Sequence, residues 1–343
     1  MNKYAGIDVS LEVSSVCVVD GEGRVLREGK VASDPACLAN WFGGLGFELS
    51  EIGLEAGPLS QWLYAGLSQA GLPVTLLETR RVRDAVRTMP VKTDRKDARI
   101  LAELMRVGWA RPVHCKSLPS QEIRTLLAAR KLLQAKRHDI EMSLRGLLRG
   151  FGLKVAQAPG KRFEPRVREL AAGHPTLELA TNALLAARAA LDKEFHQLDR
   201  MLRRLARSHE QARLAMTAPG VGALVALSFV AGIDDPARFA SSRDVGAHFG
   251  MTVRKYQSGQ TDINGRISKC GDRSVRTMLY EAAHVILTRP TVAKGTGLKS
   301  WALRLQRHKG AGKAKIALAR KLAVILHRML ADRAPFDASR VAA

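Results

Sequence analysis

Apolar and polar positions alternate in short runs over the first third of the chain. The runs KYAGIDVS, VSSVCVVD and VLREGKVA predict three strands, and GEGR predicts a hairpin turn between the last two. EIGLEAG and VTLLE predict two further strands, which alternate with helices expected over residues 35–43 and 60–70. This order predicts an α/β domain with a mixed sheet over residues 1–118.

Two much longer stretches then show helical periodicity. Residues 120–150 and 176–208 are rich in Leu, Ala and Arg and almost free of Pro, so each predicts a helix of roughly 45 Å. Helices of this length predict a coiled-coil arm over residues 119–212, with APGKRFEPRVREL as the turn between them.

The remainder of the chain, residues 213–343, has shorter periodic segments. A helical pattern follows Met216, and a basic helix is expected near residues 312–330. Between them lies a stretch rich in Gly and Lys, residues 250–271, which we expect to be flexible. The pattern predicts a mainly helical C-terminal domain.

The net charge of +23 over 343 residues is unevenly distributed. Residues 1–93 contain 9 basic and 11 acidic side chains, whereas residues 94–343 contain 46 basic and 21 acidic ones. Cations concentrated in one part of a protein favour a polyanionic partner, because they release counterions from a phosphate backbone. The charge therefore predicts binding to nucleic acid.

Hydropathy argues against a membrane protein. The longest nearly apolar run, residues 223–233, is too short to cross a bilayer, and the chain begins with a polar strand pattern rather than a signal peptide. We therefore expect a cytoplasmic protein with no membrane attachment. The four cysteines are widely spaced and have no Cys or His at zinc-finger intervals, so neither a structural zinc site nor a disulfide framework is expected.

Four acids stand where predicted elements begin or end. Asp8 ends the first predicted strand, Glu55 ends the strand in EIGLEAG, and Asp94 and Asp97 open the helix in PVKTDRKDARILAEL. Functional groups gather at the carboxyl ends of strands in α/β sheets, and a group of carboxylates in a basic protein suits Mg²⁺. Taken singly, Asp8 is typical of a strand-end turn, Glu55 of a solvated loop, and the aspartate pair of helix capping.

The motifs YAGIDVS, IGLEAG and KTDRKDARILAEL resemble the Asp, Glu, Asp, Asp series of the insertion-sequence one-hundred-ten family of transposases. The later segments APGVGALVALSFVAGIDDPARFASSRDVGAHFGM and SGQTDINGRISKCGDRSVRTMLYEAAHVIL resemble the C-terminal transposase domain of that family. The resemblance runs in order through nearly the whole chain. It implies a RuvC-like, ribonuclease-H-like N-terminal domain in which Asp8, Glu55, Asp94 and Asp97 are the catalytic, metal-binding acids.

A serine module lies in VRKYQSGQTDINGRISKCGDRSVR, where Ser258 precedes Gly259 among several cations. In isolation, Ser-Gly in a loop is usually a turn. The family resemblance implies instead that this serine is a nucleophile that attacks a phosphodiester. Members of the family commonly show two successive serines before the glycine, whereas this chain has Gln257 in the first place.

Nucleic-acid contacts are expected at the cations beside the acids, at the cations around Ser258, and at the turn PGVG. That turn resembles a helix-hairpin-helix element, which offers backbone N–H groups to a phosphate, although a plain interhelical turn has the same pattern. The candidate residues are Lys92, Arg95, Lys96, Gly220, Gly222, Arg254, Lys255, Lys269, Arg273 and Arg276.

We interpret the chain as a transposase that cuts and rejoins DNA with Mg²⁺ and a serine nucleophile. The family resemblance further implies a structured noncoding guide RNA and a homo-oligomer, dimer or tetramer, in which acids of one subunit meet the serine of another. The alternatives are a RuvC-like metal-dependent junction nuclease and a non-catalytic nucleic-acid-binding protein. GIDVS also resembles the first phosphate loop of sugar kinases and actin-like ATPases, but the chain shows no later Gly-rich adenosine loop.

Overall fold

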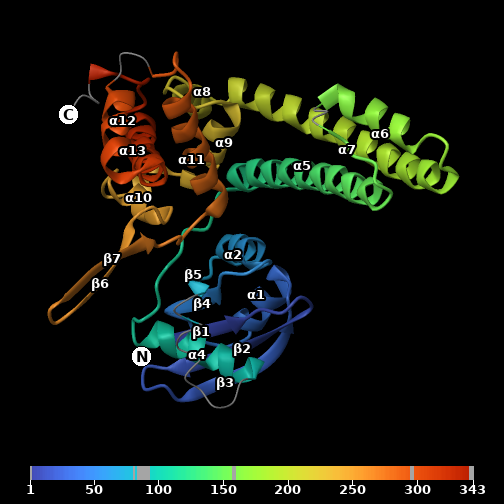
Figure 1. Cartoon of the computed structure of the whole chain (residues 1–343). Coiled ribbons are helices and arrows are strands. Elements are labelled where there is room, and N and C mark those ends of the chain that lie inside the picture. Colours follow the sequence, from blue (N-terminus) through green and yellow to red (C-terminus); the bar gives the residue numbers. More distant parts are fainter. Residues whose placement is uncertain (1, 80–81, 83–92, 157–159, 294–296, 340–343) are drawn as a thin grey trace. The chain divides into compact units, whose positions relative to one another are not determined.

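The computed structural model describes residues 2–79, 82, 93–156, 160–293 and 297–339. The chain divides into two compact units, Met1–Lys116 and Ser117–Ala343. The first unit is built around a sheet, and the second is built from helices with one hairpin (Figure 1).

A mixed sheet of five strands, counted over the described residues, forms the centre of the first unit, with the order β3-β2-β1-β4-β5. β1, β2 and β3 are antiparallel neighbours, whereas β4 and β5 continue the sheet parallel to β1. The predicted mixed α/β layer is confirmed. The strands are β1 (Lys3–Asp8), β2 (Val13–Asp20), β3 (Val25–Ala32), β4 (Glu51–Glu55) and β5 (Val74–Leu77).

Helices cover both faces of this sheet. α1 (Pro35–Gly43) and α2 (Ser60–Gln69) pack on one face, where Leu38 and Leu63 join the inward-facing residues of the strands in a buried core. α4 (Asp94–Arg106) packs on the other face, over β1, β2 and β4. Because side chains alternate along a strand, successive residues of β1 and β4 meet different helices.

The second unit begins with two long antiparallel helices, α5 (Leu118–Gly150) and α7 (Pro175–Ser208). The bounds of each helix lie within two residues of the predicted ones. Ion pairs join them along their length: Arg130 to Asp199 at 2.7 Å, Arg137 to Asp192 at 2.5 Å, and Arg188 to Glu141 at 2.7 Å.

The segment predicted to be only a turn between these helices contains a helix, so that prediction was wrong. After a short 3-10 turn, Gly160–Arg162, the chain forms α6 (Phe163–Ala171). Pro165 lies in the first turn of α6. Backbone N–H groups in a first turn have no acceptor within the helix, so the lack of an N–H in proline costs no hydrogen bond there. The apolar face of α6, including Phe163 and Val167, is buried against α5 and α7.

Within the described residues, five further helices share one core with α9, which is apolar on every side and buried from Ala226 to Ile233. The nearly apolar run is therefore a core helix. No helix in the described part of the chain is long and apolar enough to cross a membrane. The helices are α8 (Glu210–Met216), α9 (Ala223–Ile233), α10 (Asp244–His248), α11 (Arg273–Thr288), α12 (Leu298–Lys309) and α13 (Ala311–Asp332).

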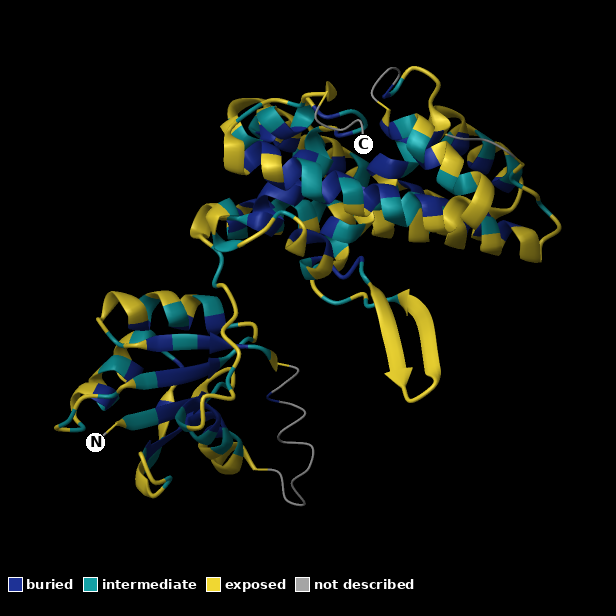
Figure 2. Ribbon diagram, turned by 90° about the vertical axis from the view of Figure 1, so that its left-hand side faces the viewer, coloured by how far each residue is buried: buried dark blue, intermediate teal, exposed yellow. Residues whose placement is uncertain are grey.

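The stretch expected to be flexible forms an antiparallel hairpin of β6 (Val253–Ser258) and β7 (Thr261–Ile267), which corrects the prediction. Figure 2 shows it as an exposed ribbon, and every residue of β6 is exposed. Because neither face is buried, the sequence lacks the apolar alternation that marks a strand.

Candidate active site

The carboxyl ends of β1 and β4 bring Asp8 and Glu55 to one edge of the sheet. The two strands are parallel, and Ile7 lies opposite Leu54. Asp8 and Glu55 each follow that pair by one position and end their strands. They therefore stand on adjacent strands, which lie about 4.8 Å apart in such sheets. Both residues are half-buried.

Both acids point to the face that α4 covers. Gly6 and Gly53 lie opposite each other, two residues before Asp8 and Glu55, so these four positions share one face of the sheet. A Cβ at Gly6 would lie 2.5 Å from the backbone nitrogen of Ala102 in α4. The missing side chain therefore lets α4 rest directly on the backbone of β1.

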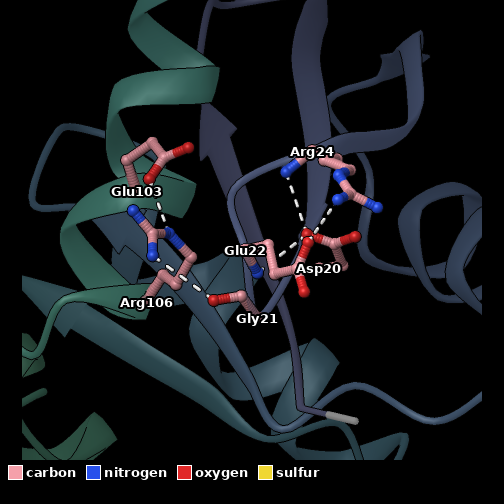
Figure 3. A network of polar contacts seen from close by, with 6 residues as sticks. All are labelled: Asp20, Gly21, Glu22, Arg24, Glu103 and Arg106. Carbon is pink, nitrogen blue, oxygen red and sulfur yellow. Dashed lines mark hydrogen bonds and ion pairs between the residues drawn. The ribbon is translucent and has the colours of Figure 1, made fainter.

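The last turn of α4 is tied to the turn between β2 and β3 (Figure 3). Arg106 Nη1 donates to the Gly21 carbonyl at 3.3 Å, while its Nε donates to Glu103 at 2.7 Å. Asp20 accepts two backbone hydrogen bonds across the turn, and the one from the Arg24 N–H is the main cause of its lowered pKa. This turn adjoins the start of β1. The first turn of α4 consequently lies toward the opposite edge, where Asp8 and Glu55 stand.

That first turn carries Asp94 and Asp97, but its N-cap is Thr93. The Thr93 hydroxyl accepts a hydrogen bond from the Lys96 N–H at 3.3 Å. The N-cap position is therefore filled by Thr93, and the two aspartates lie inside the first turn. Asp97 Oδ1 is buried and has no hydrogen-bond partner among the described residues, a condition that costs about 1–3 kcal/mol for a polar atom.

The chemistry of this edge fits a divalent cation. Four carboxylates are the oxygen donors that Mg²⁺ prefers, and the unpartnered Asp97 Oδ1 is an acceptor that a cation would satisfy. Within the described residues, no three His, Cys, Asp or Glu side chains lie close enough together to hold an ion. The donor set fits a metal, whereas the spacing of the carboxylates is wider than a shared ion requires.

Cations flank these acids. Arg95 forms an ion pair with Glu28 of β3, yet its side chain remains 78% exposed. Lys96 is exposed, and Lys92 lies outside the described residues. Glu28 was not predicted from the sequence as a residue of this region. Its position beside the first turn of α4 depends on the pairing of β3 with β2, which the sequence does not show.

Cys17, on β2 beneath α4, has a thiol whose pKa is raised to about 12, mainly by burial and further by Glu28. All four cysteines are free thiols. A buried thiol with a raised pKa stays protonated at neutral pH.

Ser258 lies at the tip of the hairpin, where it ends β6 opposite Thr261. The two-residue loop has a positive φ only at Gly259, which is 54°, as a type II′ hairpin turn requires. Ser258 shares a hairpin face with Tyr256, which pairs with Ile263. The exposed fractions of Tyr256 and Ile263 are 66% and 58%. The pair of Tyr256 and Ile263 was not predicted from the sequence. The glycine at position 259 was the signal for a hairpin turn that would have brought the two residues together.

Several of the candidate cations lie along the hairpin and at its base. Arg254 donates to the Ser268 carbonyl at 3.1 Å, and Lys255 lies 3.1 Å from Asp262 on the facing strand. Arg273 is the exposed first residue of α11. Lys269 is exposed in the loop that follows β7, with a positive φ of 55°.

Two glycines fix the base of the hairpin. Gly250 and Gly271 have φ angles of 67° and 69°, and a Cβ on either would overlap backbone atoms of the facing segment. Arg276 is half-buried and donates to the Phe249 and Cys270 carbonyls at 2.9 and 3.0 Å. The guanidinium of Arg276 therefore holds the base of the hairpin together.

The PGVG turn joins α8 to α9. Gly220 has a φ of 76°, and a Cβ there would lie 2.7 Å from Ile286 of α11, so its close approach is to a neighbouring helix. Gly222 is the exposed N-cap of α9, with no atom within 4 Å of where a Cβ would stand. Of the two glycines, Gly222 is the one that presents backbone to solvent.

Comparison with known proteins gives relatives along almost the full chain. The chain is 29% identical over 337 residues to the transposase for insertion sequence element IS1111A of Coxiella burnetii (strain RSA 493 / Nine Mile phase I), covering 96% of this chain and 89% of that protein. It is 27% identical over 279 residues to the transposase for insertion sequence element IS1328 of Yersinia enterocolitica, covering 80% and 81%. A solved structure of T. thermophilus RuvC in complex with Holliday junction substrate aligns with 33% of this chain and 100% of that chain, at 16% identity and a TM-score of 0.27.

Two family models match separate parts of the chain. The model described as Transposase IS116/IS110/IS902 family matches residues 212–295, in the second unit. The model for the DEDD transposases of IS110 matches residues 5–152, which include Asp8, Glu55, Asp94 and Asp97. The chain therefore belongs to the IS110 family of transposases, enzymes that cut and transfer DNA.

Proposed function

We propose that this transposase cuts and rejoins DNA strands with two sets of residues, the carboxylates at the edge of the sheet and the serine at the tip of the hairpin. The observation that carries the proposal is the arrangement at the edge: Asp8 and Glu55 on adjacent strand ends face the helix whose first turn holds Asp94 and the unpartnered Asp97 Oδ1. A helix cap does not call for acids at two strand ends, whereas metal-assisted phosphodiester chemistry makes use of such a set.

In this proposal Asp8, Glu55, Asp94 and Asp97 would hold Mg²⁺, which would supply positive charge to the phosphate that is attacked. The surrounding cations act on the same strand. Arg95 and Lys96 project from the first turn of α4 into solvent, so they are placed to hold phosphates beside the cleaved one. Lys92, which lies outside the described residues, is a further proposed contact.

Ser258 is the proposed nucleophile. Its Oγ forms a bond to phosphorus while the bond from phosphorus to one deoxyribose oxygen breaks. The hydroxyl proton passes to water, and the departing oxygen becomes a free hydroxyl. The hydroxyl of a second strand then attacks the phosphoserine and releases Ser258, so the phosphodiester is conserved. The exposed tip of the hairpin supports this role, because a long DNA strand can reach it.

The further partners follow from the family resemblance and from the charge of the second part of the chain. We propose that a structured noncoding RNA guides the protein to its DNA and that a dimer or tetramer combines the acids of one subunit with Ser258 of another. A DNA transposase of this kind would act in the bacterial cytoplasm. Gly222, Arg254, Lys255 and Arg273 are exposed in the second unit and are proposed contacts for either nucleic acid.

The decisive experiment is a covalent trap. A nicked substrate that cannot rejoin should leave a denaturation-resistant protein–DNA adduct whose labelled peptide contains Ser258. Ser258→Ala should lose the adduct but keep nucleic-acid affinity, because a neutral hydroxyl contributes little to salt-dependent binding. An adduct at Ser268, Ser241 or Ser242 would assign the nucleophile to that serine instead of Ser258. Cleavage by Ser258→Ala with no adduct would show a metal-dependent nuclease, the alternative function.

The acids are tested separately. Asp94→Ala or Asp97→Ala should abolish strand cleavage and leave filter binding at fixed salt almost unchanged, because each removes a metal ligand and also negative charge near the phosphate. Glu22→Ala is the matched control, since Glu22 is an exposed acid in the turn at the other end of α4. Wild-type cleavage by both aspartate variants would contradict the metal site.

A further inference from the structure

Four arginines line a hollow on the surface of α7: Arg200, Arg203, Arg204 and Arg207. All four are exposed, and their spacing places them within about 100° of the helix circumference. Residues 200–209 contain no acid. We call these four residues the arginine face of α7.

The opposite side of the same helix is anchored. Leu202 and Ala206 are fully buried in the core that surrounds α9. The arginine face therefore projects from a segment whose backbone is fixed by packing, so its charges stay in a constant spacing. A fixed row of cations binds a regular polyanion with less loss of conformational entropy than the same charges on a mobile loop.

Only part of this charge is neutralised within the protein. Arg203 donates to Asp199 at 2.6 Å, and Asp199 also accepts from Arg130 of α5. Burial acts to raise the pKa of Asp199, but the hydrogen bonds from the two arginines outweigh it, so the pKa is lowered and the carboxylate stays ionised. Arg200, Arg204 and Arg207 have no ion pair among those of the described residues.

We infer that the arginine face of α7 binds the sugar–phosphate backbone of a nucleic-acid duplex. Arg200 and Arg207 are separated by roughly 10 Å along the helix axis, which corresponds to about three nucleotides of one strand. Guanidinium groups bind phosphate oxygens in pairs of hydrogen bonds. A second copy of the same face is excluded by like-charge repulsion.

This inference rests on the proposed action on DNA and adds a surface outside its chemistry. Backbone contacts set affinity and register without reading sequence. The arginine face would therefore hold a duplex arm of the substrate or of a guide RNA, whichever sequence that arm has. DNA and RNA share the phosphate chemistry, so the experiment compares the two.

The test is a triple variant, Arg200→Gln, Arg204→Gln and Arg207→Gln, made in Ser258→Ala protein so that cleavage plays no part. Affinity for a 30-base-pair DNA duplex and for an RNA duplex of the same sequence is measured over a range of salt concentrations. For the duplex that binds here, the slope of log affinity against log salt should fall by roughly one unit per arginine, and affinity at 0.1 M salt should fall on the order of 100-fold.

The matched control removes the same charge from the same arm without removing the cluster: Lys131→Gln, Arg149→Gln and Lys193→Gln, all exposed. Circular dichroism checks that both proteins keep their helices. Loss of affinity in the triple variant alone supports the inference, and the duplex that loses affinity identifies the source of the phosphates. Unchanged binding of both duplexes, or an equal loss in the control, overturns it. Failure of the covalent trap at Ser258 would leave this result unaffected.

Discussion

Gly6 is the position where one added methyl group should lift α4 from the sheet. In Gly6→Ala the new Cβ would lie 2.5 Å from the Ala102 backbone nitrogen and 2.7 Å from Leu101 Cβ. Contacts this short with backbone are not relieved by a side-chain rotation, so the helix must retreat by roughly 1 Å to reach van der Waals distance. The first turn of α4, with its two aspartates, moves with it.

The cost follows from two opposing effects. Overpacking a well-packed contact costs about 1–3 kcal/mol, and the backbone contact at Gly6 puts it at the upper end. Alanine lowers the conformational entropy of the unfolded chain relative to glycine, which returns about 0.4–1 kcal/mol. We expect Gly6→Ala to lose about 2 kcal/mol of unfolding free energy. Strand cleavage should fall on the order of 100-fold, because a displacement near 1 Å disrupts catalytic geometry.

Gly53→Ala is the matched control on the adjacent strand. Its Cβ would meet Met105 Sδ at 2.9 Å and Leu77 Cδ1 at 3.0 Å, which are ends of flexible side chains. Rotation of these side chains should limit the loss to within about 1 kcal/mol. Urea unfolding followed by tryptophan fluorescence suits the comparison, because Trp41, Trp62 and Trp109 lie in the first unit. Equal stability of the two variants would refute this account of α4 packing.

Three further predictions concern the second unit. His327 is buried, with Nδ1 2.9 Å from Ser242 Oγ; burial, helped by Arg238, lowers its pKa below 6.5. At a pH between the two pKa values, the unfolded chain therefore binds more protons than the folded chain. The free energy of unfolding should decrease as the pH drops below about 6.5 toward the folded-state pKa. In unfolding titrations, His327→Gln should make this decrease smaller. Asp272 caps α11 and pairs with Arg124; Asp272→Ala should cost about 2 kcal/mol in urea unfolding, and a loss below a few tenths would contradict the cap. Light scattering at micromolar concentration, with and without RNA, should show a dimer or larger species, because apolar side chains are exposed on α5 and α7; a monomer in both conditions would refute the shared active site.

The sheet and its acids were accessible from the sequence because burial follows the pattern of residues there. β1 and β4 are short apolar runs that are buried in the middle and end at an acid. In such strands the boundary of the buried run is also the boundary of the element. Asp8 and Glu55 therefore stand where the pattern placed them, and the rule for parallel strands put them at one edge.

The hairpin of β6 and β7 was not accessible in this way, because its strands bury almost nothing and hydrophobic alternation reports burial. Its register depends on backbone pairing and on the two-residue turn at Gly259. The contacts that hold α4 on the sheet were equally hidden. Gly6 and Gly53 are needed because they have no side chain where α4 approaches the sheet. A single sequence does not distinguish such glycines from any other glycine in a strand.

The hairpin that carries Ser258 is fixed at its base, the pivot, and exposed to solvent along its length, so it would move like a lever if its base tilted. Its strands of six and seven residues extend roughly 20 Å from the pivot at Gly250 and Gly271. A tilt of about 10° at the pivot would sweep the serine through roughly 3 Å, the length of one hydrogen bond. The two glycines and Arg276 join that pivot to α10 and α11. Small shifts of these helices would therefore be magnified at the hydroxyl of Ser258, the proposed nucleophile, and substitutions in α10 or α11 would change its position.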